Sequence, residues 1–329
     1  MPANTKFELK LGAATREAFG KALAELGRTN PAVCALDADL SKSTYTAEFG
    51  KLFPDRFIEC GIAEADMMGI GAGLASSGKI PFASSFSVFA MNKGFEQMRV
   101  TAAFPNVNLK VVGTHSGISI GEDGPSQMSI EDLSLACSLP GFIVVSPADE
   151  ISMLKLIPLV ADHFGPAFVR AGRVKAPMVY GADQKFEIGK AIEVMPGSDV
   201  TLMATGLLLA ESIRAAESLA AEGISARVLD FHTVKPLDRE AIERAARETG
   251  AIVVSEEHLV DGGLGVRIAQ VVGETFPAVM EFVGIENTYA ESATPDQLLD
   301  KYGLRAVNVA AAARRAVERK RQASNAKGR

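Results

Sequence analysis

The segment GIAEADMMGIGAGLA (residues 61–75) has two acidic residues near its beginning and no polar residue after them. After Glu64 and Asp66, the residues MMGIGAGLA are apolar or glycine on every side, which is typical of a helix buried all round. A carboxylate that enters such a region is costly to desolvate without a strong partner, and burial raises its pKa. The segment therefore predicts a buried helix with Glu64 as a candidate acid–base residue, although a first-turn acid favoured by the helix dipole is the simpler explanation for Glu64 taken alone.

Composition and charge limit the class of protein. The 329 residues suffice for two domains, and 47% hydrophobic with 22% charged residues is ordinary for a globular protein. The net charge of −6 argues against nucleic acid as a partner, because phosphate backbones are bound by basic surfaces. We find neither a signal sequence nor an apolar run of membrane-spanning length, so we expect a cytoplasmic protein without a membrane partner.

The three cysteines predict no disulfide framework. Cys34, Cys60 and Cys137 are odd in number, lie in apolar runs and form no CxxC motif. We expect buried thiols in a reducing compartment and no metal ligands on this chain.

Short β-rich runs alternate with helical stretches through the first half of the chain. This alternation predicts an α/β fold with a largely parallel sheet that helices cover on both faces. The predicted strands are 32–38, 56–60, 81–86, 108–115, 142–148 and 167–172, and the clearest helices are 15–26, 91–104 and 150–163.

A second α/β series follows a stretch of mixed character at 173–199, which we interpret as an inter-domain connection. We expect two successive three-layer domains with mostly parallel sheets, at 1–185 and 199–322, a linker at 186–198, and a flexible polar tail at 323–329. The predicted strands of the second domain are 200–206, 226–234, 251–258 and 282–287, with helices at 207–222, 238–249, 263–274 and 304–320.

Two glycine-rich segments suggest a nucleotide site only weakly. GIGAGLA (69–75) and VDGGLGVRIAQ (260–270) both lack the GxGxxG spacing, and the chain has no Walker-type loop. Close packing or a turn explains these glycines better, so a Rossmann oxidoreductase is a minor alternative.

Two other segments carry candidate site residues. Phe86 and Phe89 follow a predicted strand, at the end where open α/β sheets bind ligands, although core aromatics would look the same. GTHSGISIGEDGPSQMSIED (113–132) places His115, Glu122 and Asp123 in a glycine-rich loop without helical pattern. A histidine and two acids in a loop have no role in packing a hydrophobic core, so this loop predicts a polar site.

Together these segments resemble the C-terminal half of transketolase, a thiamine diphosphate enzyme, in its split form with a separate C-terminal subunit. The resemblance implies a thiamine diphosphate-binding pyrimidine domain followed by a transketolase C-terminal domain. It also implies a transferase that moves a two-carbon ketol unit from a ketose phosphate to an aldose. The matching segments follow the family order: ATR (14–16), DADLSKS (37–43), GIAEADMMGIGAGLA (61–75), PFASSFSVF (81–89), THSGISIGEDGPSQ (114–127), FVRAGR (168–173) and EEHLVDGGLG (256–265).

The resemblance assigns the cofactor contacts. It implies that Glu64 hydrogen-bonds N1′ of the aminopyrimidine and so favours the tautomer that removes the thiazolium proton. Phe86 and Phe89 would stack on or wall the aminopyrimidine ring, and Asp39 and Leu40 fall where the family touches thiamine.

The resemblance also assigns substrate contacts, with some departures. It implies that His115 and Asp123 face the sugar, and that Arg16, Ser43 and Arg170 hold its phosphate. Three positions depart from the family pattern: Gln127 replaces a usual histidine, Asn92 a common aromatic residue, and Ala65 a common His or Phe.

The usual diphosphate and Mg²⁺ segment, GDG followed by Asn, is not found. The Asp-Gly pairs at 123–124 and 261–262 lack that context. We therefore expect the Mg²⁺ ligands on an N-terminal transketolase subunit, and self-association in an α2β2 heterotetramer with sugar phosphates as substrates.

Two other functions stay open from the sequence. One is the β-subunit of another thiamine diphosphate enzyme, such as a 2-oxoacid dehydrogenase E1 component or a deoxyxylulose phosphate synthase relative. The other is a scaffold subunit without its own chemistry, which the change to Gln127 keeps open and the presence of Glu64 disfavours.

Overall fold

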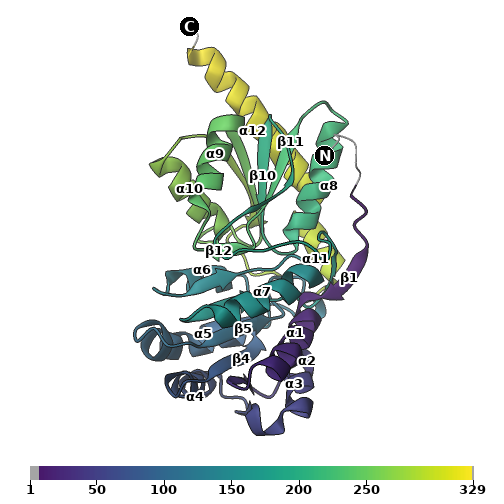
Figure 1. Ribbon diagram of the computed structural model, residues 1–329. Helices are drawn as coiled ribbons and strands as arrows, with labels where there is room; N and C mark the ends of the chain where they lie inside the picture. Colours follow the sequence, from purple (N-terminus) through teal and green to yellow (C-terminus); the bar gives the residue numbers. More distant parts are fainter. Residues whose placement is uncertain (1–6, 328–329) are drawn as a thin grey trace.

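The computed structural model describes residues 7–327 and stacks two α/β units one above the other (Figure 1). The lower unit contains a seven-stranded sheet and the upper unit a five-stranded sheet, with a two-stranded ribbon at their side. The predicted α/β class with mostly parallel sheets is thereby confirmed. In the part of the chain that the structure describes, no helix combines the length and the apolar character needed to cross a membrane.

The seven-stranded sheet is parallel except at one edge. All residues of β2, β5 and β7 are buried, as expected for parallel strands covered on both faces. Only the β12–β6 pair is antiparallel. In spatial order the strands are β12 (Thr233–Lys235), β6 (Ile143–Val145), β7 (Ala167–Arg170), β5 (Lys110–Thr114), β4 (Ile80–Phe86), β2 (Val33–Asp37) and β3 (Phe57–Glu59).

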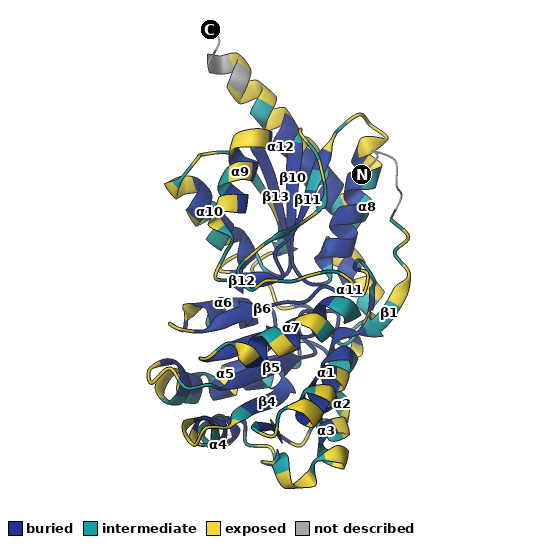
Figure 2. Cartoon of the chain, in the orientation of Figure 1, coloured by how far each residue is buried: buried dark blue, intermediate teal, exposed yellow. Residues whose placement is uncertain are grey.

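Helices cover this sheet on both faces, and their outer sides are exposed (Figure 2). Val111 and Val112 are neighbours in β5 but belong to different apolar clusters, because successive strand side chains point to opposite faces. One set of helices is α1 (Thr15–Thr29), α2 (Ser41–Thr44), α3 (Thr46–Leu52) and α7 (Glu150–Asp162). The other is α4 (Glu64–Ser76), α5 (Ser87–Gln97) with a π-helical continuation (Met98–Ala103), and α6 (Asp132–Ser138).

The five-stranded sheet has the same design with one antiparallel edge strand, β9. Its strands in spatial order are β14 (Val279–Ile285), β13 (Ala251–Leu259), β10 (Val200–Ala204), β11 (Ala226–Asp230) and β9 (Ile192–Met195). Its helices are α8 (Leu208–Ala220), which packs with α12 (Ala306–Lys327), and α9 (Arg239–Thr249), which packs with α10 (Leu264–Glu274). The remaining elements are α11 (Pro295–Lys301), the ribbon of β1 (Leu11–Ala14) with β8 (Lys175–Pro177), and 3-10 turns at Pro54–Arg56 and Gly121–Asp123.

The prediction of one strand at 226–234 is wrong. The chain leaves the upper sheet at Asp230, and β12 joins the lower sheet beside β6, with Thr233 opposite Val145. The turn between them is held by a hydrogen bond from the Ser146 amide to the His232 carbonyl, at 2.8 Å. Two apolar clusters contain residues from both units. The units are therefore joined by common hydrophobic cores as well as by the strand β12.

The predicted linker at 186–198 is partly a strand. β9 lies within it and pairs antiparallel with β11, and β8 lies within the broader connection at 173–199. Short edge strands with mixed composition give no clear alternation in sequence. The domain boundaries at 1–185 and 199–322 stay a proposal.

The prediction that helix 64–76 is buried on every side is wrong for one face of α4. An added Cβ on Gly71 would lie 2.7 Å from the Leu109 side chain, whereas the same atom on Gly69 or Gly73 would meet nothing within 4 Å. Glycine reads as apolar in a sequence pattern whether its surroundings are packed or open. The residues on the buried side are Glu64, Met67, Met68, Gly71, Ala72 and Ala75.

Other differences concern short elements and ends. Four helices of four to seven residues, α2, α3, α6 and α11, are too short for a helical period and were not predicted. The helix expected at 91–104 begins at Ser87 and ends in the π-helical segment. The final helix continues through Lys327, beyond its expected end at 320; residues 328–329 lie outside the described residues, and the flexible tail stays a prediction.

The cysteines are free thiols, as expected. Cys34 and Cys137 are buried, whereas Cys60 is half-buried rather than buried. Burial raises the pKa of each of the three thiols to about 11, so they stay protonated near neutral pH.

Asp149 gives a test of how the connection is anchored. Its fully buried carboxylate caps α7 by accepting from the Ser152 amide at 2.8 Å, and it also accepts from the Val179 and Tyr180 amides at 2.8 and 3.0 Å. We predict that Asp149→Ala lowers the free energy of unfolding by about 3 kcal/mol, because three buried donors lose their acceptor. The half-buried α9 cap Asp238 is the control, because it also accepts from the helix and from the connection, at the Ala241 and Ala191 amides, but closer to water. Asp238→Ala should cost about 1 kcal/mol. Urea denaturation measures both, and equal losses would contradict this account of Asp149.

Candidate active site

The candidate residues gather where the parallel strands of the lower sheet end. Asp39 and Leu40 follow β2, Phe86 closes β4, and His115 follows β5. These carboxyl ends are where open α/β sheets bind ligands. Phe86 and Phe89 are in direct ring contact, and Leu40 packs against the same large apolar cluster.

Strained backbone marks the same region. Asp39, Tyr45 and His115 have positive φ angles of 62°, 66° and 56° without being glycine. Such conformations persist only where surrounding contacts hold them, and they concentrate at functional sites. The Asp39 amide, for example, donates to the Glu59 carboxylate at 2.7 Å.

Glu64 is the first residue of α4, and its side chain is only 3% exposed. Among the described residues, its carboxylate has one ion-pair partner, the Lys93 ammonium at 3.4 Å, and no hydrogen bond. Lys93 is half exposed and also lies 4.8 Å from the centre of the Phe89 ring. Glu64 and Phe89 therefore face one small region from α4 and α5.

Phe86 lies at the centre of an aromatic stack. Its ring is 5.8 Å from that of Phe89 and nearly parallel to it, at 11°. The His115 ring also lies 3.8 Å from the Phe86 ring, at 29°. This stack makes an apolar wall from α5 to the loop after β5.

His115 is held as a neutral imidazole. Burial lowers its pKa to about 3, with further lowering by the nearby Arg16 and Arg173 guanidinium groups. Its Nδ1 shares a hydrogen bond with the Thr114 hydroxyl at 2.8 Å. Near neutral pH the ring is therefore available for hydrogen bonding as an uncharged group.

A pair of arginines lies beside His115. Arg16 donates to the Ser43 carbonyl at 2.7 Å and to the Arg173 carbonyl at 3.4 Å, so Arg16 lies beside the Ser43 backbone. Arg173 also bonds the Ile120 carbonyl and pairs with Glu122 at 3.1 Å. Its side chain is 34% exposed, whereas burial lowers the pKa of the more enclosed Arg16. Arg173 is a cation beside these candidates that sequence reasoning did not single out.

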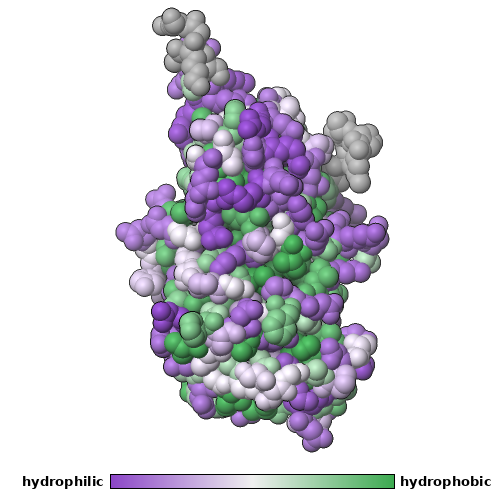
Figure 3. All heavy atoms as spheres, turned by 60° about the vertical axis from the view of Figure 1, so that its left-hand side comes forward, coloured by the Kyte–Doolittle hydropathy of each residue, from purple (hydrophilic) through white to green (hydrophobic). Residues whose placement is uncertain are grey.

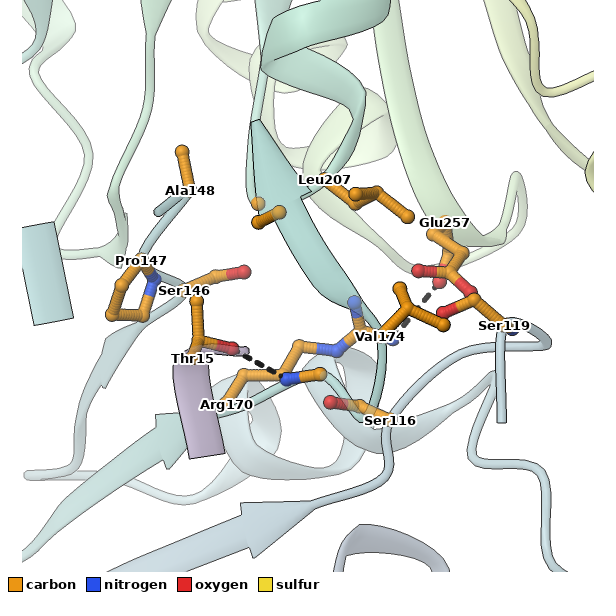
Figure 4. A pocket seen from close by; sticks show the side chains of 13 residues that line it. Thr15, Ser116, Ser119, Ser146, Pro147, Ala148, Arg170, Val174, Leu207 and Glu257 are labelled. Atoms are coloured by element: carbon orange, nitrogen blue, oxygen red, sulfur yellow. Dashed lines mark hydrogen bonds between the residues drawn. The ribbon is translucent and has the colours of Figure 1, made fainter. Parts of the chain in front are cut away.

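The structure does not place Arg170 where it would grip a substrate phosphate. Arg170 is the last residue of β7, and its side chain is only 6% exposed. Its guanidinium bonds the Asp132 carboxylate at 2.9 Å. It also bonds the Glu257 carbonyl at 2.9 Å (Figure 4). The neighbouring acids raise its pKa against the lowering effect of burial, so it is a buried internal cation.

The cavity of Figure 4 lies between the two units, beside this cation. It has a volume of about 30 Å³. Its walls mix polar and apolar groups, and they include Thr15, Ser116, Arg170 and Glu257 but neither Glu64 nor the two phenylalanines. The cavity thus belongs to the contact between the units rather than to the aromatic stack.

The remaining residues differ in their exposure. Asp123 is exposed at the end of the turn Gly121–Asp123, and among the described residues no hydrogen bond or ion pair joins it to another candidate. Gln127 is half-buried and donates to Ser126, and Asn92 is exposed and donates to Glu131 at 2.8 Å. His258, expected to be structural, is fully buried near Asp132 and Ser134.

Comparison with known families supports the assignment by sequence pattern. The family model described as transketolase, pyrimidine binding domain, matches residues 12–178, and the one described as transketolase, C-terminal domain, matches residues 189–309.

Known relatives include whole subunits of similar length. The chain is 39% identical over 318 residues to the 6-deoxy-6-sulfo-D-fructose transketolase subunit SqwH of Clostridium sp. (strain MSTE9), covering 96% of this chain and 99% of that one. It is 39% identical over 298 residues to a transketolase C-terminal section of Methanocaldococcus jannaschii, covering 90% and 93%. Human transketolase is 40% identical over 309 residues, but the match covers only 49% of its length.

Solved structures show the same relationship. A split-gene transketolase, described as an inactive beta4 tetramer, superposes with a TM-score of 0.88 at 46% identity, covering 93% of this chain and 99% of that one. Transketolase from Campylobacter jejuni shares the fold, with a TM-score of 0.79 at 22% identity over 47% of its chain.

These findings favour a transketolase over the other thiamine diphosphate enzymes and over a scaffold, and they confirm the interpretation made from sequence. The chain belongs to the transketolase family, and it is the C-terminal, or β, subunit of a split transketolase and thus part of a transketolase-type transferase.

Proposed function

We propose that this subunit, together with an N-terminal subunit, transfers a two-carbon ketol unit from a ketose phosphate to an aldose acceptor. The cofactor would be thiamine diphosphate with Mg²⁺. The observation that carries the proposal is the nearly buried Glu64 carboxylate facing the same region as Phe89 at the carboxyl edge of the lower sheet.

The residues fit the aminopyrimidine end of thiamine diphosphate. Glu64 offers a desolvated carboxylate without a hydrogen-bond partner among the described residues. A protonated ring nitrogen would supply the missing hydrogen-bond donor. Phe86 and Phe89 offer an apolar wall for a flat ring, and Leu40 packs against the same cluster. When bound, the cofactor supplies the electron-withdrawing group that carries the ketol unit.

The chain's own residues would then have three tasks. Glu64 would hold a proton at the pyrimidine N1′, and the aromatic stack would orient the ring and exclude water. His115, neutral because of its lowered pKa, would hydrogen-bond the sugar, as Asp123 would at the rim. Asp39 would make the thiamine contact through its strained backbone position.

Arg16 and Arg173 would bind the substrate phosphate, with Ser43 beside them. The two guanidinium groups lie close enough to lower the pKa of His115 together, and a dianion placed between them would gain two charge-assisted contacts. We therefore assign the phosphate to Arg173 in place of Arg170.

The diphosphate and Mg²⁺ half of the site is assigned to the partner. Within residues 7–327, no group of three His, Cys, Asp or Glu side chains is placed to hold a metal ion. The open, glycine-lined face of α4 is what a partner subunit would cover, and the exposed Ile62, Val100 and Phe104 lie next to α4 or after α5. Figure 3 shows apolar surface mainly over the lower unit, whereas the upper unit is largely hydrophilic. We propose an α2β2 heterotetramer in the cytoplasm.

Glu64→Gln tests the acid–base role. We predict a fall in kcat of about 100-fold or more in the reconstituted complex, because an amide cannot exchange a proton with the ring nitrogen. Asp66→Asn is the matched control, since Asp66 lies in the same helical turn but is exposed, and it should leave kcat within about twofold. Steady-state kinetics decide, and an active Glu64→Gln complex would remove Glu64 from the mechanism.

Arg173→Met tests the phosphate assignment. We expect the KM for a ketose phosphate to rise about 10- to 100-fold, because a charge-assisted contact is lost, while the KM for the unphosphorylated ketose stays within about twofold. Arg170→Met should instead lower the unfolding temperature, because it leaves Asp132 buried without its cation. The assignment fails if Arg173→Met affects both ketoses equally.

Separation of the subunits tests the shared site. We predict that the isolated chain binds thiamine diphosphate and Mg²⁺ weakly in calorimetry and turns over no ketose phosphate. The reconstituted complex should lose activity with EDTA and regain it with Mg²⁺. Turnover by the isolated chain would contradict the division of the site between two subunits.

A further inference from the structure

We propose that Glu257, on β13 of the C-terminal domain, is a positioning residue for the transfer reaction. It holds the loop that carries His115 and Asp123, and it acts through the backbone of Ser119. The expected change in KM rests on the proposed function, whereas the contact between Glu257 and Ser119 belongs to the fold.

The contact is close and buried. The Glu257 side chain is 4% exposed, and its Oε1 accepts from the Ser119 amide at 2.6 Å. A Cβ added to Gly117 would lie 2.2 Å from the Glu257 carboxyl carbon, so the carboxylate fills space that only glycine leaves. Gly117 also has a φ of +77°, which favours glycine for a second reason.

Further hydrogen bonds join β13 and Arg170 to the far end of this loop. The Leu259 amide donates to the Ile130 carbonyl at 2.9 Å, near the end of the loop. Arg170 donates to the Glu257 carbonyl at 2.9 Å and to the Ser129 carbonyl at 3.3 Å. The upper unit thus holds both sides of a loop whose own pairing is the single bridge between Gly117 and Ser129.

Ser119 is joined to the proposed phosphate site through the next residue of the loop. The next residue, Ile120, accepts at its carbonyl from Arg173, and Glu122 pairs with the same guanidinium at 3.1 Å. Arg173 in turn accepts from Arg16 at its carbonyl, at 3.4 Å. A shift of Ser119 would therefore move Arg173 and disturb the arginine pair.

The cofactor side is attached differently. Ser87, the first residue of α5, donates to the Asp132 carboxylate at 2.7 Å, and α5 carries Phe89. Neither this bond nor the pairing of Asp132 with Arg170 uses the Glu257 carboxylate as a hydrogen-bond partner. Loss of Glu257 should therefore act on substrate binding and spare cofactor binding.

The chain offers a matched control in the adjacent residue. Glu256 is 2% exposed, but its carboxylate accepts from the Leu264 and Gly265 amides at 2.7 and 2.8 Å, at the start of α10. Glu256 and Glu257 are thus equally buried acids on one strand that bond different segments. A general loss of stability would affect both variants alike, whereas positioning of the loop depends on Glu257.

The experiment compares Glu257→Ala, Glu257→Gln and Glu256→Ala in the complex with the N-terminal subunit. We expect Glu257→Ala to raise the KM for xylulose 5-phosphate about tenfold, with kcat and the thiamine diphosphate Kd within about threefold. Glu257→Gln keeps an oxygen acceptor and should stay within about threefold of the wild-type KM. Glu256→Ala should leave the KM within about twofold.

Hydrogen exchange gives a readout independent of turnover. Exchange at 116–124 should accelerate in Glu257→Ala, and exchange at 263–270 in Glu256→Ala. Unchanged exchange at 116–124, or an equal KM effect in Glu256→Ala, would overturn the inference. A wild-type complex inactive on ketose phosphates would contradict the proposed function instead, while exchange still tests the contact. If Glu257→Ala does not assemble, Glu257→Asp, which keeps the charge but shortens the side chain that reaches the Ser119 amide, takes its place with the same expected results.

Discussion

Glu64 keeps a carboxylate almost out of water at the first turn of α4, with the Lys93 ammonium at 3.4 Å as its ion-pair partner among the described residues. Desolvation of a charged carboxylate is unfavourable, and the helix N-terminus offsets only part of it. The close approach of α5 at Gly94, where an added Cβ would lie 2.9 Å from Met68, maintains this burial. A half-exposed lysine is a weak permanent partner, so the arrangement suits a carboxylate that receives a cofactor's ring nitrogen. In the proposed function, the aromatic wall and the arginine pair place the cofactor ring and the substrate relative to that contact.

The carboxyl edges of the two sheets meet, and a buried charge network occupies the contact between them. Arg170 comes from the lower sheet and Glu257 from the upper one, and the Arg170 guanidinium bonds both the Asp132 carboxylate and the Glu257 carbonyl. Because such a network is unfavourable when one partner is missing, it fixes the relative placement of the two units. The C-terminal domain therefore contributes order to the loop after β5 through the Glu257 carboxylate and the Leu259 amide.

Much of the fold could be predicted because parallel strands and their helices carry strong apolar patterns. Such patterns do not reveal pairing partners, which is why the strand at 226–234 was not divided between two sheets. The same limit applies to Arg170 and Arg173, two identical side chains three residues apart. The strand ends at Arg170, so that side chain turns inward to Asp132, whereas Arg173 lies beyond the strand beside Arg16. Glu64 and the phenylalanines were chosen as candidates because their segments carry the family pattern. The open face of α4 was missed because glycine looks the same in both settings.

The most direct test of this account is a crystal structure of the assembled two-subunit complex with thiamine diphosphate bound. We predict that the Glu64 carboxylate lies within about 3.2 Å of the pyrimidine ring nitrogen. The ring should lie against Phe89, and the diphosphate should be held by the N-terminal subunit. A cofactor bound with its ring nitrogen beyond hydrogen-bonding distance of Glu64, or with its diphosphate held by this chain, would contradict the central claim.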